Sequence, residues 1–148
     1  MKIDITPLEK ALRELDENLQ FLDAKAWGDN ERHKRIFERA AVQAFDFTYG
    51  VAIGLLIRQM EHDAPDPAKL SALGIEDRFR LAANSGLIPD VARFFDYRKK
   101  RNLTSHNYNE EISRQLIAIL NPFAQDMRFL LKQLQERHPE ARDFPLDK

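Results

Sequence analysis

Hydrophobic residues recur every three or four positions between positions 5 and 26, which is the spacing of one face of an α-helix. Thr6 and Pro7 predict where this helix begins, because threonine can cap a first turn and proline suits the first helical position. We expect the helix to end near Trp27-Gly28, since glycine readily adopts the left-handed conformation found at helix C-termini.

A second, longer helix is expected from about Glu31 to Met60, with Asp29 or Asn30 as its cap. Its central part is apolar around most of the circumference, which is typical of a helix that touches several neighbours. One narrow face carries small or polar residues, namely Arg39, Gln43, Asp46, Gly50, Gly54 and Arg58. The two glycines lie one turn apart and would let another backbone approach, either within the monomer or at a subunit interface.

The remaining pattern predicts shorter helices and one long final helix. Prolines and aspartates at 62–67 indicate a turn, and a short helix is expected over Ile75–Ala83. Another helix can begin at Pro89, and the last should run from about Glu110 to Arg137. Because Pro122 lies inside this last helix, we expect a kink there.

These segments predict an all-α fold, an antiparallel bundle of four or five helices. A single domain is expected over residues 1–138, followed by a flexible, mixed-charge tail at 139–148. The full length of 148 residues, with 43% hydrophobic residues and five glycines, suits one domain with a substantial core.

Composition excludes several classes of protein. The absence of cysteine excludes a disulfide scaffold and thiolate metal sites. No apolar run approaches the roughly 18–20 residues that span a bilayer, so we expect a cytoplasmic protein with no membrane partner. A net charge of −1 argues against coating nucleic acid through bulk electrostatics.

The segment from Arg101 to Asn109 is the candidate for chemistry, because it is dense in hydrogen-bonding groups and joins two helices. Arginine offers a fork of donors that fits phosphate, and histidine exchanges protons near neutral pH. With no carboxylate cluster in the segment, we expect no metal and no cofactor. The fitting reaction is attack of an RNA 2′-hydroxyl on its neighbouring phosphate, with Arg101 stabilising the phosphorane and His106 as base or acid.

Helix geometry limits how these two residues can meet. Five positions apart on one straight helix, Arg101 and His106 would point about 140° apart. They converge only if the helix breaks between them, with Asn107 capping the next helix, or if a second chain supplies its own copy. A purely structural interpretation is also open, in which Arg101 caps a helix C-terminus and His106 bonds a backbone carbonyl. The candidate substrate-binding residues around the pair are Arg98, Lys99, Lys100, Asn102 and Ser105.

Arg101-Asn102, His106 and Tyr108 together resemble the signature of HEPN domains. More narrowly, the chain resembles the nucleotidyltransferase substrate-binding proteins and the related HepT toxins over most of its length. The resemblance extends to Phe45–Tyr49 in the central helix and to Ala82–Ile88 before the motif.

The family resemblance implies a helical homodimer whose cleft brings two motifs together, and a minimal nucleotidyltransferase as partner. In toxin–antitoxin versions the helical protein is a ribonuclease, and the partner silences it by transferring AMP to the tyrosine that corresponds to Tyr108. The alternative is a non-catalytic substrate-binding subunit of a two-component nucleotidyltransferase, with a nucleotide as ligand. One departure is that Asn109-Glu110 follows the tyrosine where relatives often carry an aspartate first. A plain interaction bundle without an active site is the third hypothesis.

Overall fold

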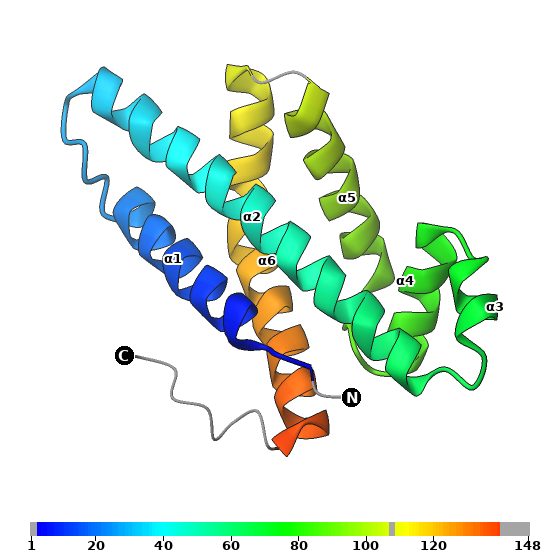
Figure 1. Cartoon of the computed structure of the whole chain (residues 1–148). Coiled ribbons are helices and arrows are strands. Elements are labelled where there is room, and N and C mark those ends of the chain that lie inside the picture. The colour runs from blue at the N-terminus through cyan, green and yellow to red at the C-terminus, as the bar shows by residue number, and fades with distance from the viewer. Residues whose placement is uncertain (1–2, 107–108, 140–148) are drawn as a thin grey trace.

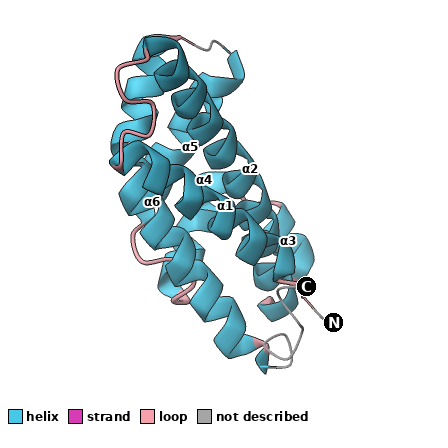
Figure 2. Cartoon of the chain, turned by 90° about the vertical axis from the view of Figure 1, so that its left-hand side faces the viewer, coloured by secondary structure: helices cyan, strands magenta, loops and turns pink. Residues whose placement is uncertain are grey.

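The computed structural model describes residues 3–106 and 109–139, and every regular element of appreciable length within them is helical (Figure 2). The helices in chain order are α1 (Thr6–Asp23), α2 (Glu31–Asp63), α3 (Pro67–Ser71), α4 (Ile75–Asn84), α5 (Val91–His106) and α6 (Glu110–Arg137). The predicted all-α bundle is confirmed.

Helix α2 is the centre of the bundle. It crosses the molecule diagonally between α1 and α5 (Figure 1), and it contacts α1, α3, α4, α5 and α6. Phe45, Ala52 and Leu56 on α2 are completely buried. A helix with neighbours on several sides must be apolar around most of its circumference, which explains the sequence pattern.

The hydrophobicity of α2 corrects one expectation from the sequence. An 18-residue window of this helix has a mean hydropathy of 1.6, long and apolar enough to cross a membrane by length and composition. The expectation that no segment approaches that length is therefore wrong on this measure. In the bundle, 44% of that window is buried. Contacts with the other helices account for the buried part of this window, and the rest of it faces outward.

The ends of α1 differ from the prediction. Thr6 is the first helical residue rather than the cap, and its N–H donates to the Asp4 carboxylate at 3.0 Å. The helix ends at Asp23, several residues before Gly28, whose φ of +57° instead serves the turn into α2. At the start of α2, Asn30 is the cap and accepts from the N–H of His33 at 3.0 Å.

The later helices follow the pattern with three differences. The short helix α3 was not predicted, although Asp66 caps it and Pro67 begins it. Helix α5 begins at Val91 rather than Pro89. Helix α6 has the predicted bounds, but its cap is Asn109, which accepts from the N–H of Ile112 at 2.9 Å. The predicted cap, Asn107, lies outside the described residues.

The bundle remains packed at the end of α6. His138 is only 4% exposed and hydrogen-bonds to the Gln59 side chain. Arg137 donates to the backbone carbonyl of Ser85 at 2.6 Å. The helical packing thus continues to His138, and the domain boundary expected there stays a prediction. Positions 140–148 of the predicted tail lie outside the described residues.

Candidate active site

The helix that carries the motif is fastened to α6 by a buried carboxylate. Asp126 is 4% exposed, and the Tyr97 hydroxyl donates to its Oδ2 at 2.6 Å. Arg93 donates to the same carboxylate through Nε at 2.8 Å and Nη2 at 2.9 Å. Burial, followed by the bond to Asp126, raises the pKa of Tyr97 and keeps its hydroxyl protonated. This cluster sets the position of α5 one turn before Arg101.

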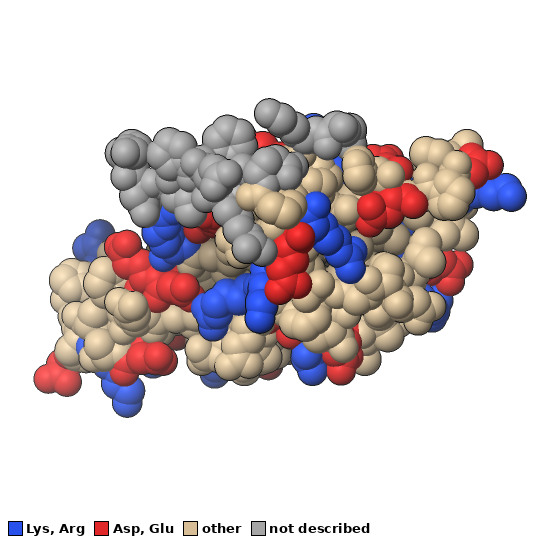
Figure 3. Space-filling model, turned by 90° about the horizontal axis from the view of Figure 1, so that it is seen from below, with Lys and Arg blue, Asp and Glu red and all other residues tan. Residues whose placement is uncertain are grey.

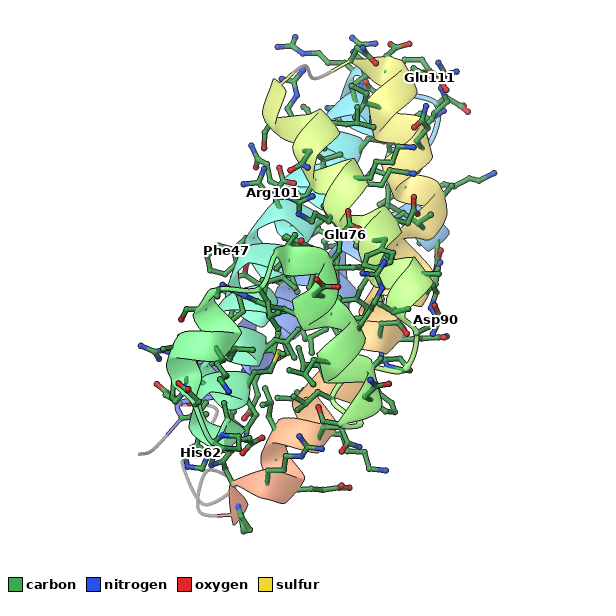
Figure 4. The ribbon with its side chains drawn as sticks, turned by 90° about the vertical axis from the view of Figure 1, so that its right-hand side faces the viewer. Phe47, His62, Glu76, Asp90, Arg101 and Glu111 are labelled. Carbon is green, nitrogen blue, oxygen red and sulfur yellow. The ribbon has the colours of Figure 1, made fainter. Side chains whose placement is uncertain are left out.

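Arg101 lies where α5 faces the middle of α2. Its Nε is 3.7 Å from Oδ1 of Asp46 on α2, and the hydroxyl of Thr104 donates to the same Oδ1 at 2.8 Å. The Arg101 side chain is 35% exposed and that of Asp46 is 29% exposed. Figure 4 shows Arg101 at the surface between the two helices. The cation is thus held in place yet accessible to a ligand.

Hydroxyl groups of α5 also hold Arg101. Its Nη1 donates to the hydroxyl of Ser105, and Ser105 in turn donates to the Arg101 backbone carbonyl at 3.1 Å. The Thr104 hydroxyl lies 2.8 Å from that same carbonyl. The local helix and α2 together hold the arginine, whereas the end of α5, where a C-terminal cap would act, adjoins residues outside the described ranges.

Two ionisable groups beside Arg101 are perturbed by burial. Burial raises the pKa of the Asp46 carboxyl, and the Thr104 hydrogen bond and the charge of Arg101 oppose that rise. Burial likewise raises the pKa of the Tyr49 hydroxyl, against the charges of Arg98 and Arg101. Perturbed pKa values occur at functional sites and also in structural clusters such as Tyr97–Asp126, so the case for this junction rests on its geometry.

The structure separates the predicted binding residues into two sets. Arg98, Lys99 and Asn102 are exposed on α5, and Arg98 lies one turn before Arg101 on the same side of the helix. Lys100 instead pairs with Asp96 at 2.9 Å, and its side chain is only 15% exposed. Figure 3 shows one face of the molecule, on which basic and acidic side chains are interspersed rather than segregated by sign. At the Arg101 site itself, the exposed basic side chains of α5 are those of Arg98 and Lys99.

The continuity of α5 settles one geometric alternative. The helix runs unbroken from Val91 to His106, so the break considered as one way for Arg101 and His106 to converge does not occur. Their positions on the helix are therefore about 140° apart. The side chain of His106, together with Asn107 and Tyr108, lies outside the described residues. A second copy of the chain is the remaining way in which the predicted pair could converge.

The outer face of α2 beside this site is exposed. Phe47 is 59% exposed and projects from the helix (Figure 4). At Gly50 and Gly54 no described atom lies within 4 Å of where a Cβ would stand. The interpretation of these glycines as close packing inside the monomer is therefore wrong. Because glycine has no side chain, the backbone of α2 is accessible at these two positions, which suits the close approach of another backbone.

Two hollows lie elsewhere on the described surface, and the described residues offer no metal site. One hollow, of about 380 Å³, is lined by the start of α1 and by Phe47 of α2. The other, a mainly apolar groove of about 500 Å³, lies near the C-terminal end of α2, beside α3 and α4, and includes Met60, Leu70, Leu81 and Leu87. It is roughly 20 Å along α2 from Asp46, from the helical rise per residue. Among residues 3–106 and 109–139, no group of three His, Cys, Asp or Glu side chains could hold a metal ion.

Sequence reasoning did not find Thr104 as a contact of Asp46. The two residues are 58 positions apart, and only the packing of α5 on α2 brings them together. The available signal was Asp46 itself, because it is the lone acidic residue between positions 39 and 60 of a strongly apolar helix.

Comparison with known proteins places the chain in the family that its sequence resembles. The family model described as "Nucleotidyltransferase substrate binding protein like" matches residues 3–136. The Haemophilus influenzae protein named "Probable ribonuclease HepT" is 30% identical over 139 residues, which cover 93% of this chain and 95% of that protein.

A solved Haemophilus influenzae structure has a similar fold. It superposes with a TM-score of 0.81 and 30% identity, and the match covers 86% of this chain and 96% of that one. That structure is described as revealing the fold of a substrate-binding domain of a nucleotidyltransferase. The family match spans nearly the whole described bundle, and the chain therefore belongs to the nucleotidyltransferase substrate-binding protein family.

Proposed function

We propose that this protein is a HEPN-type, toxin-like ribonuclease that cleaves RNA as a homodimer without a metal. The observation that carries the proposal is Arg101, a cation fixed by Asp46 and Ser105 yet exposed enough to meet a phosphate. The relative named as a ribonuclease supports the same activity. Family membership supports association with a nucleotidyltransferase.

The reaction would use the 2′-hydroxyl of the RNA as nucleophile. That oxygen forms a bond to the adjacent phosphorus, and the bond from phosphorus to the 5′-oxygen breaks. The products are a 2′,3′-cyclic phosphate and a free 5′-hydroxyl. His106 takes the proton from the nucleophile or gives one to the leaving oxygen. Arg101 donates to the phosphorane oxygens, where negative charge develops.

The dimer would bring the two motifs into one cleft across the outer face of α2. Exposed Phe47 supplies apolar contact area, and Gly50 and Gly54 permit close approach. In such a dimer, Arg101 of one copy could approach His106 of the other, although the two residues point apart on α5 of one chain. The exposed Arg98 and Lys99 of both copies, with Asn102, would line the cleft and contact RNA.

Regulation would act at Tyr108. A minimal nucleotidyltransferase partner would catalyse attack of the tyrosine hydroxyl on the α-phosphorus of ATP, with release of pyrophosphate. The bulky, anionic AMP group would then stand two positions from His106 and repel the RNA phosphate. Incubation with the partner and ATP should add the mass of one AMP to the wild type and none to Tyr108→Phe.

The deciding experiment is a ribonuclease assay in EDTA with a mixed RNA, using unmodified wild type and His106→Ala. Cleavage by the wild type alone, leaving 2′,3′-cyclic phosphate ends, is the expected result. Lys substitution of Arg101 keeps the charge but loses the planar fork, so Arg101→Lys should also be impaired.

The alternative function is a non-catalytic, substrate-binding subunit of a two-component nucleotidyltransferase. The similar solved structure, described as a substrate-binding domain, favours it. Absence of cleavage by a folded dimer that carries no AMP on Tyr108 would support this alternative, provided that the protein binds a nucleotidyltransferase stably.

A further inference from the structure

Asp46 occupies an unusual position for a carboxylate. It lies on the most apolar helix of the bundle, and its side chain is 29% exposed. Its Oδ1 receives the Thr104 hydroxyl at 2.8 Å and lies 3.7 Å from Nε of Arg101. An acidic group beside a phosphate-binding cation opposes RNA binding, so its presence needs a physical reason.

We propose that Asp46 is a positioning residue that orients the Arg101 guanidinium for transition-state stabilisation, a role that rests on the proposed ribonuclease function. Asp46 does not itself touch the RNA. It acts through Arg101, with Thr104 holding the carboxylate in place from the neighbouring helix.

The described contacts of the Arg101 guanidinium involve two of its nitrogens and leave the third for a ligand. Asp46 lies beside Nε, and Ser105 accepts from Nη1. Nη2 is the nitrogen left for a phosphate among the described contacts of Arg101. A guanidinium is planar, so fixing two nitrogens fixes the direction of the third. Preorganised donors of this kind stabilise developing charge without having to reorient during the reaction.

This role predicts opposite effects on binding and turnover. Replacing Asp46 with asparagine keeps the shape and a hydrogen-bond acceptor for Thr104, but it removes one negative charge. RNA should then bind more tightly, whereas the guanidinium loses its orientation. A residue with only a structural role would lower the amount of active protein and leave KM unchanged.

The experiment compares kcat and KM of wild type, Asp46→Asn, Thr104→Val and Asp96→Asn on one RNA in EDTA at low salt. For Asp46→Asn we expect kcat to fall about tenfold, less than the roughly 10²–10³-fold loss on removing a transition-state donor, because Arg101 itself remains. Its KM should fall by about two- to fivefold, the range of a partly exposed charge interaction. This gain should disappear at high salt.

The other two variants separate charge from orientation. Thr104→Val retains the Asp46 charge but removes the hydrogen bond that holds it, so kcat should fall while KM is unchanged. Asp96→Asn removes a carboxylate that pairs with Lys100 on the same helix, without touching Arg101. Its KM should fall while kcat stays at the wild-type value. Equal kcat in wild type and Asp46→Asn would overturn the proposal.

A measurement independent of activity distinguishes failure of this proposal from failure of the proposed function. An inactive, unmodified wild type would refute the ribonuclease. The Arg101 Nε–Hε signal in NMR, assigned with Arg101→Lys, still tests the positioning. Slower hydrogen exchange and less motion of this group in wild type than in Asp46→Asn would support it. Identical exchange and motion in both proteins would overturn it.

Discussion

The bond between Tyr97 and Asp126 should contribute measurably to stability, because both partners are buried. Tyr97 is 2% exposed and Asp126 is 4% exposed, and their oxygens are 2.6 Å apart. Tyr97→Phe removes one hydroxyl and leaves the ring packing in place. Asp126 keeps its two bonds from Arg93, so its charge remains partnered.

The expected loss follows from the type of bond removed. Hydrogen bonds to charged groups contribute about 1.5–3 kcal/mol, and we take about 2 kcal/mol because Asp126 remains bonded to Arg93. For a domain of roughly this size, each kcal/mol corresponds to about 2–4 °C in Tm. Tyr97→Phe should therefore unfold about 4–8 °C below wild type. Urea unfolding should show a lower midpoint at the same m value.

A surface carboxylate provides the matched control. Asp16 pairs with Arg128 at 2.7 Å, but the two side chains are 42% and 48% exposed. Asp16→Asn should cost no more than about 1 kcal/mol, because solvent screens exposed ion pairs. All proteins should be compared at one concentration, since self-association would shift apparent stability. A loss in Tyr97→Phe as small as that in Asp16→Asn would refute the argument that burial strengthens this bond.

Three further predictions concern the site and its supports. Because burial raises the pKa of the Asp46 carboxyl, the native state binds that proton more readily than the unfolded chain. In urea titrations, the free energy of unfolding of wild type relative to Asp46→Asn should therefore rise as pH falls towards 4. A decrease in this difference would show that folding lowers the pKa of Asp46 instead of raising it. Asn109→Ala removes the N-terminal cap of α6 and should cost about 1 kcal/mol in the same assay, with Asn102→Ala as the exposed control. Phe47→Lys should convert the proposed dimer to monomer in sedimentation without unfolding, and an unchanged mass would place the interface elsewhere.

Much of the fold could be predicted because it is specified locally. The apolar periodicity of α6 and the Asn30 cap of α2 gave bounds close to those observed. The helix ends that were predicted wrongly, such as the C-terminus of α1, lie where a local turn signal and the packing of the helix favour different residues. Gly28 does adopt a left-handed conformation, but in the turn after the helix has already ended at Asp23. Sequence identifies a residue that permits a turn, but packing decides where the helix stops.

Within the site, only contacts between residues that are close in the sequence could be predicted. Arg101 and Ser105 are four positions apart on one helix, so their contact follows from helical geometry. The contact between Asp46 and Thr104 depends on how α5 crosses α2, which no spacing in the sequence reveals. The pairing of Lys100 with Asp96 is local as well. The basic run from Arg98 to Arg101 suggests a continuous cationic surface, but Asp96 on the same helix neutralises Lys100 within it.

The structure of a single chain also bears on why this fold would act in pairs. An uninterrupted α5 places the positions of Arg101 and His106 on different sides of one helix. The same molecule leaves Phe47, Gly50 and Gly54 uncovered on the face of α2 next to Arg101. Because the two glycines carry no side chain, a second helix could approach the α2 backbone closely there and contact Phe47. If two copies meet there, the helix that keeps the two residues apart in one chain becomes the element that presents them to each other across the interface.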